Sequence, residues 1–283
     1  MIDAYLARLG LTGPLTPDLE TLFAVHRAQV ETVSYENVDL YLGKPPGIDP
    51  AETIDRIARG RGGYCYQLNG ALATLLAELG YAVTWHVGGV HSAEGPVGAV
   101  GNHLALTVSG LPSIANPDGV WFVDAGLGDA LHEPMPLREG ISRQGPFTYA
   151  LERSTVIDGG WHFVHAADAS FVGMDFGPVA RGPADFAEFH RYRSTSPESN
   201  FTKLLVVSRR YADSVRMVRG VHFVEHSAKG RSSRRTTKEE WVDELTALLD
   251  LRDVDLDALW DKANVDYEAW LATQDPAAES AAS

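Results

Sequence analysis

The sequence contains a single cysteine, Cys65, among its 283 residues. One cysteine excludes an intrachain disulfide, and no Cys/His cluster has the spacing of metal ligands, so we expect no bound metal. Long apolar runs are also absent. No stretch approaches the roughly 18 apolar residues of a membrane span, and residues 1–6 lack a basic region ahead of an apolar one. We therefore expect a cytoplasmic protein without membrane contact.

Positive charge is scarce as well. Lys and Arg number 24 against 38 Asp and Glu, giving a formal net charge of −14, which argues against nucleic acid as a partner because phosphate backbones are bound by concentrated cations. The exception is a basic island between residues 209 and 238, formed by Arg209, Arg210, Arg216, Arg219, Lys229, Arg231, Arg234, Arg235 and Lys238. The island suits the phosphates of an anionic cofactor such as coenzyme A; alternatively, residues 229–235 form a solvated hairpin tip.

The spacing of apolar residues changes along the chain. A helical period covers residues 2–10, 17–30, 49–58 and 65–79. Thr16 is the predicted N-cap of the second helix and Pro17 its first residue. From residue 81 short alternating runs are separated by Gly, Pro, Asn and Asp, which predicts antiparallel β-structure, and after about residue 190 strands and helices mix.

These patterns predict an α+β protein. We expect a helical bundle over residues 1–82, an antiparallel β-barrel over 83–190 and an α/β region over 191–272. Residues 273–283 are small and polar and are predicted to be disordered.

Cys65 is the first candidate for chemistry. It follows Gly62 and Gly63 and precedes a leucine-rich helix that ends at Gly80. A thiolate is stabilised at a helix N-terminus, and two preceding glycines allow a tight turn and leave space beside the sulfur. The alternative is that Cys65 is a small, buried and inert core residue.

A thiolate nucleophile needs a base, and the base needs a residue that orients it. His103 begins an apolar, strand-like run, and Asp124 ends another, just before a Gly-x-Gly turn. If these two strands are neighbours, the imidazole and the carboxylate face one site. Taken singly, His103 fits a hydrogen-bonded strand histidine and Asp124 a turn residue.

Taken together, three segments resemble the signatures of the bacterial, actinobacterial-like arylamine N-acetyltransferases. They are Arg-Gly-Gly-Tyr-Cys at 61–65, the histidine with its apolar run, and Val-Asp-Ala-Gly-Leu-Gly at 123–128. Two further stretches, Tyr-Glu-Asn-Val-Asp at 35–39 and the serine-rich segment 194–201, extend the resemblance over about residues 2–210.

The resemblance implies a papain-like Cys-His-Asp core, with a helical bundle, a β-barrel and an α/β lid. It implies that Cys65 takes the acetyl group of acetyl-coenzyme A as a thioester, with His103 as base and Asp124 orienting it, and that xenobiotic arylamines or arylhydrazines are the acceptors. The remaining roles that it implies are an ion pair of Arg61 and Glu36, an acceptor pocket of Tyr35, Leu127 and Phe201, and coenzyme contacts at Asn102, Gly126 and Gly128.

The chain departs from the family pattern at Tyr66, Gln67, Asn102 and Leu127, where the family usually has Phe, Glu, Thr or Ser, and Phe. The triad stays intact, and two positions of the acceptor pocket are altered, because Tyr35 adds a hydroxyl and Leu127 removes a ring. The same site also fits an amide synthase that closes a polyketide macrolactam with a chain from a carrier protein. Hydrolysis or crosslinking by a thiol enzyme, and ligand binding without catalysis, are further alternatives that the motifs favour less.

Overall fold

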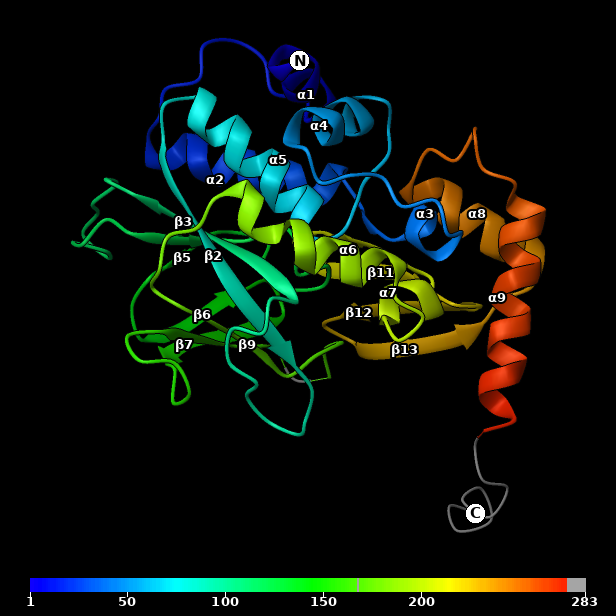
Figure 1. The fold of residues 1–283 in the computed structure, drawn as a ribbon. Helices are drawn as coiled ribbons and strands as arrows, with labels where there is room; N and C mark the ends of the chain where they lie inside the picture. The colour runs from blue at the N-terminus through cyan, green and yellow to red at the C-terminus, as the bar shows by residue number, and fades with distance from the viewer. Residues whose placement is uncertain (167, 274–283) are drawn as a thin grey trace.

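The computed structural model describes residues 1–166 and 168–273, and it confirms the predicted α+β fold. Helices surround the N-terminus, a barrel-like sheet lies beside them, and a second sheet carries the C-terminal helices (Figure 1). Most of the tail predicted to be disordered lies outside the described residues. None of the helices in the described part of the chain combines the length and apolar character needed to cross a bilayer.

Five helices form the N-terminal part. They are α1 (Ile2–Arg8), α2 (Leu19–Thr32), α3 (Val38–Tyr41), α4 (Pro50–Ala58) and α5 (Cys65–Glu78). Two of them, α2 and α4, begin at an aspartate cap. The prediction of Thr16 as the cap of α2 is wrong, because the side chain of Asp18 accepts the N–H of Thr21 at 2.8 Å and the helix begins two residues later than predicted. Asp49 caps α4 in the same way.

Helix α5 lies at the centre of this part. Eleven of its 14 residues are buried, so it is apolar on nearly all sides, as expected for a helix enclosed by the core. It packs against α4 on one side and against strands of the barrel on another. This position fixes Cys65, its first residue, between the helices and the barrel.

The barrel-like sheet has eight antiparallel strands. They are β2 (Ala82–His91), β3 (His103–Ser109), β4 (Trp121–Val123), β5 (Met135–Pro136), β6 (Gly140–Gln144), β7 (Phe147–Arg153), β8 (Trp161–Val164) and β9 (Gly173–Phe176). Their order is β5-β4-β3-β2-β9-β8-β7-β6. Aromatic and other apolar side chains, among them Phe122, Phe163 and Met174, form its buried core. The long pairing of β2 with β9 joins segments that are distant in sequence.

The second sheet has the order β1-β10-β11-β12-β13. Its strands are β1 (Tyr35–Glu36), β10 (Val206–Arg210), β11 (Ser214–Arg219), β12 (His222–Ser227) and β13 (Gly230–Arg235). A short 3-10 turn η1 (Pro183–Phe186) and helices α6 (Ala187–Thr195) and α7 (Asn200–Lys203) lead into it, and α8 (Lys238–Leu248) and α9 (Leu256–Leu271) follow it. The edge strand β1 belongs to the N-terminal helical part, so main-chain hydrogen bonds between β1 and β10 join that part to the second sheet.

Candidate active site

Cys65 is the first residue of α5 and is 2% exposed. Gly62 and Gly63 were predicted to leave space beside the sulfur. They instead allow neighbouring atoms to pack closely against the backbone before Cys65. A Cβ on Gly62 would lie 1.9 Å from the carbonyl oxygen of Ser34, and one on Gly63 would lie 2.5 Å from Oε1 of Gln67. That Oε1 accepts the N–H of Tyr64 at 3.2 Å, so Gln67 caps the helix that carries the thiol.

His103 and Asp124 come from neighbouring strands. The predicted pairing is confirmed, because β3 pairs antiparallel with β4 and Asp124 directly follows β4. His103 Nε2 lies 2.7 Å from Asp124 Oδ2, and both side chains are buried. Cys65 lines the same cavity as His103, and its thiol donates to the carbonyl of Asn102, the residue before His103, at 3.8 Å. The structure thus brings the three predicted residues together.

The environment of His103 favours the charged imidazolium. Burial alone lowers the pKa of His103, but the carboxylate of Asp124, its hydrogen bond and the contact with Cys65 outweigh burial and raise this pKa to about 10. An imidazolium that persists at neutral pH can pair with a thiolate. A thiolate is the form of cysteine that attacks carbonyl carbon.

Asn69, one turn along α5 from Cys65, was not found from the sequence. Its Nδ2 donates to Leu104 O at 2.6 Å and to Asp124 Oδ1 at 2.8 Å, and its Oδ1 accepts the N–H of Ala125 at 2.9 Å. The side chain is fully buried. Asn69 therefore connects the nucleophile helix, the histidine strand and the aspartate turn, and no sequence motif signals this role.

The turn after Asp124 lies directly against the start of α5. A Cβ on Gly126 would lie 2.7 Å from the Cα of Cys65, closer than real side chains approach backbone. The N–H of Gly126 donates to Asp124 Oδ1 at 2.9 Å, which fixes the carboxylate. Glycine is required at this position because of close approach.

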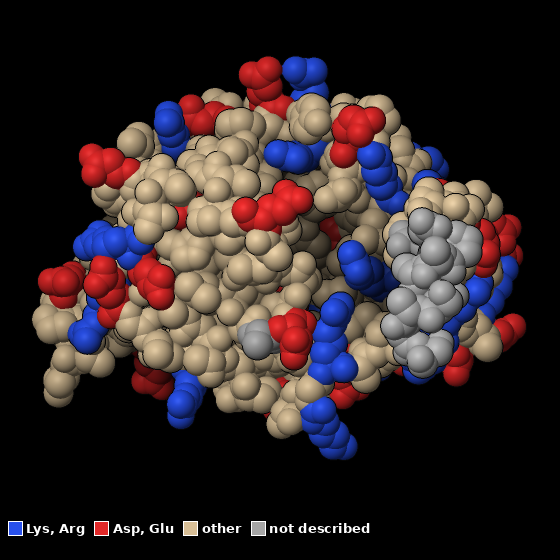
Figure 2. Space-filling view, turned by 90° about the horizontal axis from the view of Figure 1, so that it is seen from below, with Lys and Arg blue, Asp and Glu red and all other residues tan. Residues whose placement is uncertain are grey.

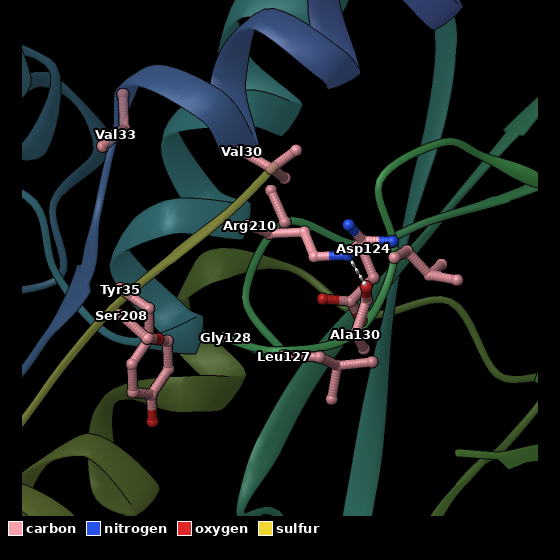
Figure 3. A pocket seen from close by; sticks show the side chains of 11 residues that line it. Val30, Val33, Tyr35, Asp124, Leu127, Gly128, Ala130, Ser208 and Arg210 are labelled. Carbon is pink, nitrogen blue, oxygen red and sulfur yellow. Dashed lines mark hydrogen bonds between the residues drawn. The ribbon is translucent and has the colours of Figure 1, made fainter. Parts of the chain in front are cut away.

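A cavity of about 500 Å³ opens beside the three residues. It is lined by all six predicted substrate and coenzyme positions: Tyr35, Leu127, Phe201, Asn102, Gly126 and Gly128. Arg193 and Arg219 line it too. Figure 3 shows a smaller pocket that shares Tyr35, Leu127 and Gly128 with this cavity.

The hydrogen bonds of Asn102 and the burial of Tyr35 restrict the roles that these two predicted pocket residues can have. The side-chain amide of Asn102 bonds the N–H and carbonyl of Val90 at 2.7 and 2.8 Å, so it fastens the histidine strand to β2. Burial, with the nearby Cys65 and Asp129, raises the pKa of Tyr35 well above its usual value. Tyr35 therefore presents a neutral hydroxyl.

The ion pair of Arg61 and Glu36 is present, at 3.3 Å, and Asp39 and Arg56 extend it into a network. Glu36 is 2% exposed, so the network is largely withdrawn from water. It joins the segment before Cys65 to α3 and α4. Its residues do not line the cavity beside Cys65, which points to a structural contribution.

Four of the nine residues of the basic island pair with acids that lie on later helices. Arg216 and Arg234 pair with Glu244, Arg235 pairs with Glu268, and Lys238 pairs with Asp257. The guanidinium of Arg210 is buried and donates to Ala130 O at 2.8 Å, as Figure 3 shows. The strand β13 at its tip is exposed along its whole length, which favours the hairpin interpretation for residues 229–235.

Two island members, Arg219 and Arg231, line a cavity instead. Neither Arg219 nor Arg231 forms an ion pair within the described residues, and both line a second cavity, of about 720 Å³, on the C-terminal sheet. Arg219 also lines the cavity beside Cys65, so this one side chain borders both. In Figure 2 this face of the molecule is hollowed, with lysine or arginine side chains along the rim.

A papain-like fold that brings cysteine, histidine and aspartate together defines the class of thiol-dependent acyl-transfer proteins. The N-acetyltransferase family model matches residues 18–257. An arylamine N-acetyltransferase of Mycolicibacterium smegmatis is 31% identical over 239 residues, covering 80% of this chain and 82% of the relative. The chain belongs to the arylamine N-acetyltransferase family and is an acetyltransferase.

Solved structures agree in fold. The arylamine N-acetyltransferase of Mycobacterium abscessus superposes with a TM-score of 0.82 at 26% identity, covering 93% of this chain and 95% of that one. The Mycobacterium marinum enzyme in complex with CoA has a TM-score of 0.78 at 22% identity, covering 93% of this chain and 98% of that one.

Proposed function

We propose that this enzyme moves an acetyl group from acetyl-CoA to arylamines or arylhydrazines through a thioester on Cys65. The observation that carries the proposal is a buried imidazole that bonds the carboxylate of Asp124 and lines one cavity with Cys65, whose thiol donates to the residue next to this histidine. This arrangement opens onto a cavity large enough for a small aromatic acceptor.

The first half-reaction makes the thioester. The Cys65 thiolate, paired with the His103 imidazolium, attacks the acetyl carbonyl, and the C–S bond to coenzyme A then breaks. The leaving thiolate takes its proton from His103. The N–H groups of Cys65 and Tyr66, at the start of α5, donate to no acceptor in the described part of the chain, so they are candidates to stabilise the oxyanion.

The second half-reaction releases the product. The amine nitrogen attacks the thioester carbonyl, and His103, which is neutral after the first step, accepts the amine proton. The C–S bond to Cys65 breaks and the thiolate–imidazolium pair is restored. Asp124 keeps the ring in the required orientation throughout because Asn69 and Gly126 hold its other oxygen.

Coenzyme A would occupy the cavity beside Cys65, along Asn102, Gly126 and Gly128. Its phosphates would meet Arg193 and Arg219, since guanidinium groups bind phosphate oxygens well. The complex of the Mycobacterium marinum relative with CoA supports coenzyme A as the donor. We infer an aromatic acceptor beside Tyr35, Leu127 and Phe201, which includes xenobiotic amines.

A cytoplasmic location is part of the proposal, because a reactive cysteine without a disulfide partner suits a reducing compartment. The alternative of a macrolactam-forming amide synthase uses the same three residues. The relatives described above are arylamine N-acetyltransferases, and this similarity does not favour the amide synthase alternative.

Intact mass spectrometry tests the proposal. Protein incubated with acetyl-CoA without amine should gain the mass of one acetyl group, and an arylhydrazine should remove it. Cys65→Ala should gain nothing, and Asn264→Ala, a change on helix α9 that does not line the cavity beside Cys65, should behave as the wild type. A folded wild-type protein that gains no acetyl group from acetyl-CoA would overturn the proposal, and a carrier-bound polyketide donor would be tested next.

A further inference from the structure

Three potential metal ligands lie together on the barrel-like sheet. His91 ends β2, His162 is on β8, and Asp175 is on β9. Their donor atoms all lie within 4.8 Å of one another, and Nδ1 of His162 is 3.2 Å from Oδ1 of Asp175. The sequence does not reveal this group, because its members are far apart along the chain and have no ligand spacing.

The register of the strands explains the grouping. His162 lies directly opposite Asp175, and His91 lies opposite Gly173, two residues earlier on the same face of β9. Phe163 and Met174 point to the other face, into the barrel core. The three ligands are therefore on the outer face of the sheet.

Two of the donor groups are buried and have unpaired atoms. Asp175 is 0% exposed and His91 6% exposed. Nε2 of His91 and Oδ2 of Asp175 have no hydrogen-bond partner in the described part of the chain. An unpaired buried carboxylate oxygen costs about 1–3 kcal/mol or more, so these atoms need a ligand that the protein itself does not provide.

Gly173 keeps space open between these atoms. A Cβ at this position would lie 2.8 Å from His91 Nε2 and 2.9 Å from His162 Cε1. The φ of Gly173 is not positive, so the backbone does not demand glycine. A Cβ would also lie 2.8 Å from the carbonyl oxygen of Phe163, so glycine permits the close approach of β8 and leaves space beside the two imidazole rings, which stack at 5.3 Å between centroids.

Neighbouring groups orient the ligands as in metal sites. Nδ1 of His91 lies 2.9 Å from the carbonyl of Ser92, which accepts a hydrogen bond and so leaves Nε2 with its lone pair. The hydroxyl of Ser154 donates to Asp175 Oδ1 at 2.7 Å. Metal-binding histidines and carboxylates are commonly held by such partners.

We propose that His91, His162 and Asp175 bind one divalent transition-metal ion of the zinc class. Two imidazoles and one carboxylate suit Zn²⁺ and leave a fourth position for water. Bonds of about 2.0–2.2 Å place tetrahedral donors roughly 3.4 Å apart, so side-chain rotation has to draw the outermost donors together. His162, 16% exposed, gives the ion a path of entry.

The ion joins the end of β2 to β8 and β9. His91 and Ser92 line the cavity beside Cys65, and the adjacent Val90 is bonded to Asn102, which precedes His103. Ion binding therefore stabilises the end of the strand that positions the histidine strand. The role is structural, and acetyl transfer is not routed through the ion.

The test uses tag-free Cys65→Ser protein, because Cys65 and His103 would themselves attract Zn²⁺. Isothermal titration with Zn²⁺ should give one site per chain. Asp175→Asn and His162→Ala should weaken it about 100-fold or more, and Ser154→Ala about 10-fold. His222→Ala, a histidine of the other sheet, should leave affinity unchanged. Folding of each variant is checked by circular dichroism.

Two further readouts leave the three ligands and Ser154 unchanged. Co²⁺ bound to Cys65→Ser should show the visible absorption of a four-coordinate nitrogen and oxygen site. Crystals soaked in Zn²⁺ should show an anomalous peak between His91 and Asp175. No Zn²⁺ binding by the folded protein, or a peak only at other residues, would overturn the proposal.

Discussion

Replacing Asn69 by alanine tests how the site is held together. The change removes three buried hydrogen bonds. The side chain of Asn69 donates two of them, to Leu104 O and Asp124 Oδ1, and accepts the third from the N–H of Ala125. Two are bonds between neutral groups, worth about 0.5–1.5 kcal/mol each, and the one to the carboxylate is worth about 1.5–3 kcal/mol. We expect Asn69→Ala to lower the free energy of unfolding by about 3–5 kcal/mol.

Activity should fall as well. Asp124 keeps its bonds to His103 and Gly126, so the imidazole stays near its place but loses precise orientation. Because misplacement by about 1 Å costs up to roughly 100-fold in rate, we expect a 10- to 100-fold lower kcat for acetyl transfer. Cysteine acetylation, followed by mass spectrometry, should slow in parallel.

Urea unfolding followed by circular dichroism measures the first effect, and steady-state kinetics at a temperature where the variant is folded measures the second. Asn264→Ala is the matched control. Its half-buried side chain accepts one hydrogen bond, from Arg235 at 3.3 Å at the surface, so the stability of this variant should stay within about 0.5 kcal/mol of the wild type. If Asn69→Ala unfolds within 1 kcal/mol of the wild type, the connecting role assigned to this side chain is wrong.

Three other changes have definite expectations. Gly126→Ala places a Cβ 2.7 Å from the Cα of Cys65, so the aspartate turn must move and thioester formation, measured by mass, should drop at least tenfold; unchanged rates would contradict this. Glu36→Ala removes the buried carboxylate that lies 3.3 Å from Arg61, so we expect the free energy of unfolding, measured in urea, to fall by about 3 kcal/mol. A decrease of less than about 1 kcal/mol would contradict this expectation. For His26, burial lowers the pKa from 6.5 to about 4, so its contribution to stability is complete above pH 6.5 and is lost as the pH falls towards 4, by up to about 3 kcal/mol. His26→Gln should show a flatter dependence of unfolding free energy on pH over this range, and identical curves would refute the assignment.

The predicted parts of the site are those with local signals. Cys65 is preceded by glycines and followed by a leucine-rich helix, and Asp124 ends a hydrophobic run at a glycine turn. The strands of His103 and Asp124 are successive in the chain, and successive antiparallel strands commonly pair, so their meeting follows from topology. A local sequence pattern and the succession of the two strands in the chain were sufficient to predict that these residues meet.

What the sequence could not reveal depends on register and on distant partners. His91 and Asp175 meet because β2 pairs with β9 across a long intervening segment, and a slip of one residue would turn either side chain into the barrel core. The charge of the basic island could not be assessed from sequence for a different reason. Glu244 and Glu268, which pair with three of its arginines, lie on later helices whose packing no local pattern indicates.

The pairing of β1 with β10 determines how the cleft can respond to substrate. Tyr35 pairs with Ser208 on the C-terminal sheet, and the next residue, Glu36, donates its N–H to Gly63 O at 2.9 Å, two residues before Cys65. One short strand therefore bonds both the C-terminal sheet and the nucleophile segment. Movement of that sheet as a free lid would break these bonds, so acceptor preference should be set by side chains at Tyr35, Leu127 and Phe201 within a fixed frame.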